Sequence, residues 1–136
     1  KLVTNKIEDT SGSVTFSLDD KFIFYSKLDE HHRPRKIFRH KLGTSVKDDQ
    51  LIFEEKSEAF TCGIGVSSDE KYYFISTSDH NTSEQYYFSA DEENPKPKLI
   101  KERKRGIIYS VNSWNGKFYL HTSVYWKCDF QCYLLD

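Results

Sequence analysis

The sequence has no methionine, only three cysteines, no long apolar run and no excess of either charge. Its 136 residues are enough chain for one hydrophobic core. No apolar stretch approaches the ~18 residues of a membrane-spanning helix, and no signal-peptide core follows the first residues. Lys and Arg number 20 against 21 Asp and Glu, so no basic surface favours nucleic acid. We therefore expect a soluble chain without a membrane or nucleic acid partner.

The cysteines predict a reduced protein. Their odd number argues against the disulfide framework of a secreted domain. Cys128 and Cys132 lie four residues apart in a strand-like stretch. That spacing is roughly 13 Å along a strand, whereas a disulfide needs Cα atoms within about 7 Å. We therefore expect free thiols and a cytoplasmic location.

Aromatic residues are abundant, and they recur in a repeated pattern. The 10 Phe, 9 Tyr and 2 Trp favour β-structure. Three segments resemble one another: LDDKFIFYS (18–26), SDEKYYFIS (68–76) and WNGKFYLHT (114–122). In each of them, a pair of turn-forming residues precedes a lysine, and apolar residues follow it. This pattern predicts three hairpins, with lysines at positions 21, 71 and 117.

A second type of segment repeats with nearly the same period. Its copies are KLVTNK (1–6), QLIFEE (50–55) and KLIKER (98–103), and Leu2, Leu51 and Leu99 are 49 and 48 residues apart. We expect each copy to be the outer strand of a four-stranded unit, so that residues 1–6 complete a preceding unit. Further strands are expected on either side of the aromatic ones: 13–18, 61–67 and 107–113, and then 36–43, 84–90 and 128–135. The expected total is twelve strands.

Four strands in about 48 residues is the period of a β-propeller. The predicted fold is all-β, a partial propeller with blades at 13–55 and 61–103 and three strands of a blade at 107–136. Blades stack face to face, which explains the continuous apolar runs of the middle strands. Charges in KLIKERKR suit an exposed edge strand. The alternative is a sandwich or barrel with hairpins that look alike by chance, but two segment types sharing one period favour the propeller.

The stretch DEHHRPRKIFRHKLGTSVKDDQLIFEE carries a more specific pattern. It combines His32-Arg33-Pro34, Ile37-Phe38, His40-Lys41-Leu42-Gly43-Thr44, Asp48-Asp49 and Leu51-Ile52-Phe53-Glu54-Glu55. With Thr82-Ser83-Glu84 and RKRGIIYSVNSWNGKFYLHTS, this pattern resembles the propeller of the prolyl oligopeptidase family, and within it the oligopeptidase B (protease II) branch. The resemblance covers essentially the whole chain.

The resemblance implies a peptidase part without the peptidase chemistry. Members of the family combine an α/β-hydrolase domain bearing a Ser-Asp-His triad with a propeller that admits only short peptides, and this branch cuts after Arg or Lys. The chain matches only a middle portion of the propeller, so we expect no catalytic domain here and no hydrolysis by the chain alone. It has no G-x-S-x-G nucleophile elbow, since VNSWNG lacks the first glycine. The implied partners are the catalytic domain and the remaining blades.

Several residues suggest other sites, and each has a simpler structural explanation. His31, His32 and His40 invite a metal, but no Cys or carboxylate recurs with them at zinc-like spacing. Cys62 is a reactive thiol only if its pKa is lowered, and a buried inert thiol is the simpler expectation. Gly63-Ile64-Gly65 lacks the third glycine and the helix of a phosphate loop, and we interpret it as close packing of an inner strand.

A basic cluster near the end of the second unit suggests an acidic partner or nucleic acid. It consists of Lys96, Lys98, Lys101, Arg103, Lys104 and Arg105. Acidic residues at 91–93 and 102 interrupt it, which favours a solvated edge strand. We therefore predict no catalytic, metal or cofactor residue in the chain.

A second function class is a free-standing β interaction module that assembles through its open blade edges. Two chains would supply six blade equivalents, within the propeller range. Residues 1–5 would add the fourth strand to the last unit, within the chain or by strand exchange in a homodimer.

Overall fold

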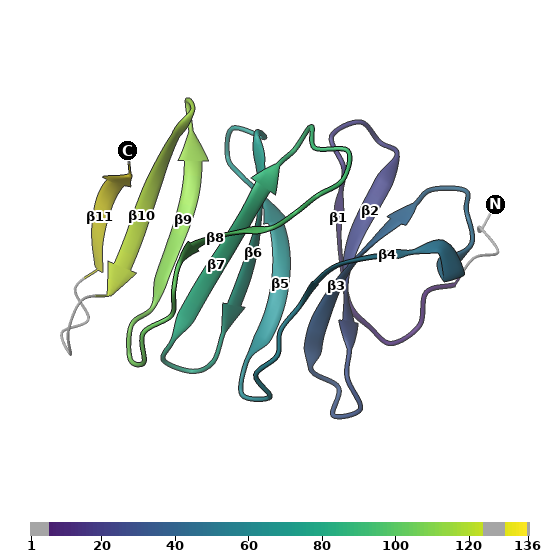
Figure 1. Ribbon diagram of the computed structural model, residues 1–136, viewed down its shortest axis with the longest axis horizontal. Coiled ribbons are helices and arrows are strands. Elements are labelled where there is room, and N and C mark those ends of the chain that lie inside the picture. Colours follow the sequence, from purple (N-terminus) through teal and green to yellow (C-terminus); the bar gives the residue numbers. More distant parts are fainter. Residues whose placement is uncertain (1–5, 124–129, 136) are drawn as a thin grey trace. The chain divides into compact units, whose positions relative to one another are not determined.

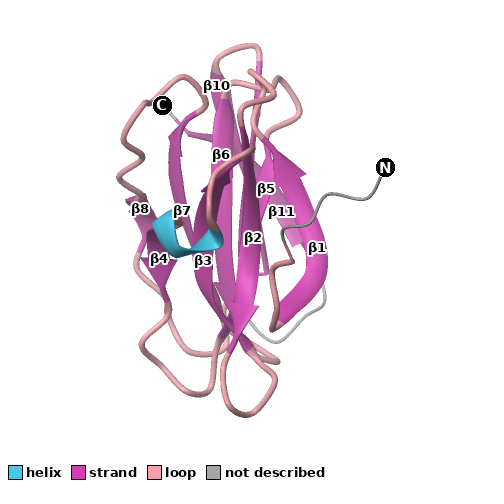
Figure 2. Cartoon of the chain, turned by 90° about the vertical axis from the view of Figure 1, so that its right-hand side faces the viewer, coloured by secondary structure: helices cyan, strands magenta, loops and turns pink. Residues whose placement is uncertain are grey.

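The computed structural model describes residues 6–123 and 130–135 as strands, turns and one short 3-10 helix, η1 (Val46–Asp48) (Figures 1 and 2). The strands of the first sheet are β1 (Thr10–Phe16), β2 (Phe22–Leu28), β3 (Pro34–Lys41) and β4 (Gln50–Glu54). The second sheet has β5 (Thr61–Val66), β6 (Tyr72–Ser78), β7 (Ser83–Ser89) and β8 (Lys98–Lys101), and the third has β9 (Tyr109–Trp114), β10 (Lys117–Ser123) and β11 (Phe130–Leu135). In this part of the chain, no helix is long and apolar enough to cross a membrane.

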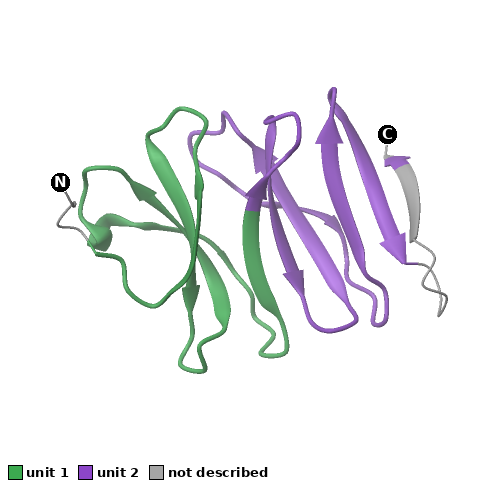
Figure 3. Ribbon diagram, turned by 180° about the vertical axis from the view of Figure 1, so that it is seen from behind, with its two compact units in different colours: residues 1–64 green, residues 65–136 purple. Residues whose placement is uncertain are grey.

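The sheets confirm the all-β, partial-propeller fold. Their strands follow the order of the chain: β1-β2-β3-β4, β5-β6-β7-β8 and β9-β10-β11, with antiparallel pairing within the first and third sheets and along β6-β7-β8. The strand expected at 1–6 falls on residues 1–5, outside the described part, and so do Cys128 and the start of the strand expected at 128–135. The chain divides into two compact units, Lys1–Ile64 and Gly65–Asp136, with the boundary inside β5 (Figure 3).

The first two hairpins are built by the same local hydrogen bonds. In the second, Ser67 Oγ donates to Asp69 and accepts the N–H groups of Lys71 and Tyr72. Equivalent bonds surround Ser17 in the first hairpin. Serine and aspartate favour such turns because their side chains bond to nearby backbone groups. The predicted turn residues Asp19 and Asp69 therefore take part in these turns, together with serines that the prediction did not include.

The third hairpin aligns with the first two without gaps, residues 113–118 with 17–22 and 67–72, but its turn is different. Asn115 and Gly116 have φ values of 51° and 72°, and Trp114 pairs with Lys117 across them. Two consecutive positive φ values are typical of a two-residue type I′ turn, for which Asn-Gly is the preferred sequence. In such a turn, Trp114 and Lys117 form the hydrogen-bonded pair that closes the hairpin.

This difference reverses the faces of the third sheet. Ser67 N–H donates to Tyr72 O at 2.8 Å, so those two residues are a hydrogen-bonded pair. Their counterparts in the repeat, Ser113 and Phe118, lie one step beyond the closing pair, and Ser113 N–H donates to Asn112 Oδ1 instead. Hydrogen-bonded and non-hydrogen-bonded pairs alternate along a hairpin. The two side chains of a pair lie on the same face of the sheet, and those of the next pair lie on the opposite face. Tyr72 and Phe118 therefore point to opposite faces of their own sheets.

The core of the second compact unit forms where those two faces meet. It contains buried Phe74, Tyr109, Val111 and Leu120, with half-buried Tyr72, Tyr87, Ile100 and Phe118 packed against them. The Phe118 ring lies edge-on to Tyr72, with centroids 5.0 Å apart, and to Tyr87 at 5.1 Å. Edge-to-face aromatic pairs are stabilising beyond the area that they bury. This cluster joins the second sheet to the third.

Middle strands were expected to be buried on both faces, and two of the three are. Residues 24–26 of β2 and 73–75 of β6 are buried without interruption. In β10, which belongs to the last unit, Leu120 is buried but Tyr119 is 36% exposed. The strand alternates because only one face of its sheet is covered among the described residues.

Candidate functional site

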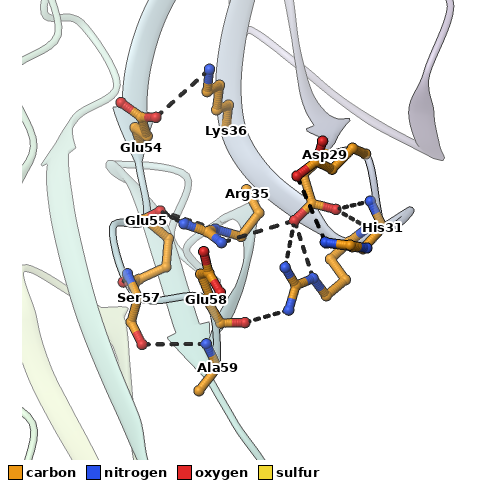
Figure 4. A network of polar contacts seen from close by, with 11 residues as sticks. Asp29, His31, Arg35, Lys36, Glu54, Glu55, Ser57, Glu58 and Ala59 are labelled. Atoms are coloured by element: carbon orange, nitrogen blue, oxygen red, sulfur yellow. Dashed lines mark hydrogen bonds and ion pairs between the residues drawn. The ribbon is translucent and has the colours of Figure 1, made fainter.

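A network of charged residues in the first compact unit joins two loops, 29–33 and 55–59 (Figure 4). Asp29 organises the first loop. Its carboxylate accepts the backbone N–H groups of His31 at 2.8 Å and Arg33 at 2.9 Å. It also receives the Arg33 guanidinium, through Nε at 3.1 Å and Nη2 at 2.9 Å. His32 adopts a φ of 58° to close this turn.

Two arginines tie the first loop to the second. Arg35 donates from Nε and Nη2 to the carbonyl oxygen of Glu55, at 3.0 and 2.7 Å, and its Nη1 lies 3.9 Å from Asp29. Arg33 reaches the carbonyl oxygen of Glu58 at 2.6 Å. Burial alone would raise the pKa of Asp29, but the hydrogen bonds and charge of Arg33, with the His31 N–H, outweigh it and lower that pKa to about 2. The network is thus a charged clamp between loops.

The second sheet contains the same clamp with its charges exchanged. Asp79, like Asp29, accepts two backbone N–H groups from the turn that follows it, from Asn81 at 2.9 Å and Thr82 at 2.7 Å. Here, however, the acid is on the strand and the base is in the loop. Glu84 accepts Arg103 Nη2 at 2.8 Å and the Arg103 N–H at 2.8 Å. Burial would raise the pKa of Glu84, but the Arg103 bonds hold it below its usual value.

The three histidines considered as metal ligands from the sequence do not come together. His31 and His32 are exposed in the loop, whereas His40 is buried on β3 with Nδ1 2.5 Å from Asp49 Oδ1. The other oxygen of Asp49 accepts the Tyr25 hydroxyl at 2.7 Å. Burial, and then the Asp49 carboxylate, raise the pKa of Tyr25. In the part of the chain that the structure describes, no group of three His, Cys, Asp or Glu side chains is arranged to hold a metal.

Two interpretations of the inner strand β5 can be compared with the structure. They concern the reactivity of the Cys62 thiol and the packing around Gly63 and Gly65. Burial, with the nearby Glu55 carboxylate, raises the pKa of the Cys62 thiol to about 12, so the reactive-thiol alternative is wrong. The interpretation of Gly63 and Gly65 as close-packing positions is also wrong. A Cβ built at either glycine meets no atom within 4 Å.

The basic cluster separates into two kinds of residue. Arg103 is half-buried in the clamp with Glu84. The other members, Lys96, Lys98, Lys101, Lys104 and Arg105, are exposed on and beside β8. This division agrees with a solvated edge strand, which β8 forms in the second sheet.

A buried polar junction between β7 and β9 was not anticipated from the sequence. Ser83 Oγ donates to the Tyr109 carbonyl and accepts the Tyr109 N–H, both at 2.7 Å. Gln85 Oε1 accepts the Val111 N–H at 2.5 Å, and the Tyr109 hydroxyl accepts the Gln85 N–H at 2.9 Å. These bonds fix the register between two neighbouring sheets. Breaking any of these hydrogen bonds would leave a buried polar group without a partner, which is costly. The hydrogen bonds therefore make the junction rigid.

Comparisons with known proteins agree with this architecture. The family model "Prolyl oligopeptidase, N-terminal beta-propeller domain" matches residues 1–126. Protease 2 of Moraxella lacunata is 38% identical over 112 residues, covering 82% of this chain and 16% of that protein. Dipeptidyl aminopeptidase BI of Pseudoxanthomonas mexicana is 25% identical over 124 residues, covering 90% of this chain and 17% of that protein. The chain thus spans about a sixth of the length of these relatives.

Solved structures show the same fold. Oligopeptidase B from Trypanosoma brucei, in a closed form with covalently bound antipain, superposes with a TM-score of 0.91 at 23% identity, over 98% of this chain and 19% of that one. Oligopeptidase B from Leishmania major gives a TM-score of 0.84 at 21% identity, over 90% of this chain and 17% of that one. The repeated four-stranded sheets and the family match lead to one conclusion. The chain belongs to the prolyl oligopeptidase family and is part of its N-terminal β-propeller domain.

Proposed function

We propose that this chain is a wall segment of the propeller of an oligopeptidase B-like serine peptidase, and that it restricts which peptides reach the catalytic site. The chain itself carries out no chemistry. Its partners are an α/β-hydrolase domain and further blades, the peptidase cleaves short peptides after Arg or Lys, and its location is cytoplasmic. The family match over residues 1–126 carries this proposal.

The contacts between sheets support a restricting role. A wall excludes large substrates only if neighbouring blades do not open. In the second compact unit, the Tyr72–Phe118 ring contact and the Ser83–Tyr109 hydrogen bonds hold adjacent sheets together. The clamps at Asp29 and Glu84 fix loops at the strand ends. These contacts favour a rigid wall over a flexible one.

A chimera tests the proposal. The part of this chain that matches Protease 2 of Moraxella lacunata replaces the corresponding 112-residue segment of that protein. We expect the chimera to fold and to cleave fluorogenic peptides after Arg and Lys with kcat/KM within about tenfold of the parent, while the 136-residue chain alone cleaves none. A folded chimera without this activity would overturn the proposal, and so would hydrolysis by the isolated chain.

A second candidate function, self-assembly as an interaction module, is favoured by one apolar row in the first sheet. Val14, Tyr25, Phe38 and Leu51 pair in register across its four strands. The two ends of the row are open, since Val14 is 52% and Leu51 46% exposed, whereas Tyr25 between them is buried. If a second copy covers this row, light scattering will give a mass near twice 16.1 kDa, and V14K with L51K will return the monomer. A monomeric wild-type chain rules this candidate out.

A further inference from the structure

The lysines of the first two hairpins are equivalent in sequence but not in charge environment. Lys21 Nζ lies 3.3 Å from Asp19 Oδ2. The corresponding oxygen of Asp69 is engaged differently, because it accepts Ser113 Oγ at 2.8 Å and the Gly116 N–H at 3.3 Å from the next hairpin. Within residues 6–123 and 130–135, the Lys71 ammonium has no carboxylate within ion-pair distance.

This ammonium lines a surface hollow. Asp69, Lys71, Trp114 and Asn115 line an open depression with a volume of about 340 Å³. Trp114 is 60% exposed, so much of its indole is free for a ligand. Lys71 Nζ is held over the third hairpin turn, 3.9 Å from where a Cβ on Gly116 would lie. The lining of the hollow thus includes a cation, an indole and a carboxamide.

The acid in the hollow is already occupied. Asp69 Oδ1 accepts from Ser67 Oγ at 2.8 Å and from the Lys71 N–H at 3.4 Å, in addition to the two donors on Oδ2. Its lone pairs therefore point at the turn and not at a ligand. A further exposed cation, Lys117, stands opposite Trp114 in the β9–β10 register. Lys117 is not part of the lining, and because the oxygens of Asp69 are engaged by the turn, the Lys71 ammonium is the charge left for a ligand, which favours an anion.

We propose that this hollow binds the free C-terminal carboxylate of a short peptide. The carboxylate pairs with Lys71 and accepts from the Asn115 amide, and the last apolar side chain packs on the Trp114 indole. Only the choice of a peptide as ligand rests on the proposed function. The charge and shape of the hollow are independent of it.

Titration of the isotope-labelled chain tests this site by NMR at low salt. The probe is acetyl-Ala-Ala-Leu with a free carboxylate, compared with its C-terminal amide and with acetyl-Ala-Glu-Leu amide. We expect the free acid to shift the Lys71, Asn115 and Gly116 amide signals and to bind at least about threefold more tightly than either amide, as an exposed ion pair allows. Equal affinity for the free acid and its amide overturns the proposal. Equal binding of the Glu peptide assigns the site to side-chain carboxylates, and so overturns it too.

Matched variants separate this site from general charge effects. K71Q is expected to weaken the free acid about threefold, and W114A to remove the preference for Leu over Ala at the last position. K21Q, at the equivalent lysine already paired with Asp19, is expected to change nothing. Equal weakening by K21Q and K71Q contradicts the assignment. None of these outcomes depends on peptidase activity, so failure here leaves the chimera result untouched.

Discussion

Tyr72 and Phe118 occupy the same position in two successive repeats, yet their rings meet edge to face with centroids 5.0 Å apart and planes at 85°. Simple repetition would point both side chains the same way. The type I′ turn at Asn115-Gly116 shifts the hydrogen-bonded pairs of the third hairpin by one step and thereby reverses its faces. One turn therefore determines which aromatic side chains join the second and third sheets.

Removing the Phe118 ring should destabilise the second compact unit. Its ring also lies 5.6 Å from Phe74 and 5.1 Å from Tyr87, and it is only half-buried. We expect F118A to lower the free energy of unfolding by about 2–3 kcal/mol, below the range for a fully buried Phe. Y119A, on the exposed face of the same strand, should cost less than about 1 kcal/mol. Urea unfolding followed by circular dichroism measures both, and similar costs would contradict the cluster.

The turn itself should be sensitive at Gly116. Its φ of 72° is strained for any residue with a Cβ, so we expect G116A to lower the free energy of unfolding by about 1–2 kcal/mol. Gly63 is the matched control because it lies in a strand with open space where a Cβ would be. G63A should be neutral or slightly stabilising. Thermal unfolding of the two variants tests this, and a larger loss for G63A than for G116A would refute it.

The Asp29 clamp predicts a dependence of stability on acid pH. Its pKa is about 2 in the folded chain and about 3.9 when unfolded, so its stabilising contribution is complete above about pH 4 and disappears as the pH falls through about 2. D29N should therefore be less stable than the wild type at pH 7, and the difference should shrink towards pH 2.

The control for the Asp29 clamp is E30Q, because the neighbouring Glu30 side chain is 87% exposed. E30Q should leave the curve of stability against pH unchanged. A difference in the free energy of unfolding between D29N and the wild type that stays constant from pH 7 to pH 2 would show that the ionised carboxylate does not hold the loop.

Cys62 should be unreactive in the folded chain. A pKa of about 12 leaves almost no thiolate at neutral pH, and the side chain is buried. In a C128S/C132S background, we expect Ellman's reagent to modify Cys62 only after urea is added. Rapid modification without denaturant would contradict its burial.

The strand order was predictable because its signals are local. Turn residues before Lys21 and Lys71, and the repeated Leu-apolar strands, mark positions that recur regardless of long-range contacts. Strand starts were less accurate, since β1 begins at Thr10 and not at residue 13. The reversed face of β10 was missed, although Asn115-Gly116 is itself the signal of a two-residue turn.

The polar contacts were less predictable, because each needs a partner from another strand or loop. The sequence suggests His40 as a metal ligand and also argues against it, but it does not identify Asp49, the partner of His40, which lies nine residues on, just after η1. The Ser83–Tyr109 junction has no local signal at all. The exchanged charges of the two clamps explain why no shared motif marked them: the strand residue is the base Arg35 on β3 but the acid Glu84 on β7.

The most direct test of the central claim is the ability of the chimera to discriminate by substrate size. The measurement is the ratio of cleavage rates for a short Arg peptide and for unfolded casein. We predict that the chimera matches the ratio of Protease 2, and that adding Y72A and F118A lowers the ratio while short-peptide cleavage persists. A folded, active chimera that degrades casein as readily as the short peptide would contradict the proposed restricting role of this chain.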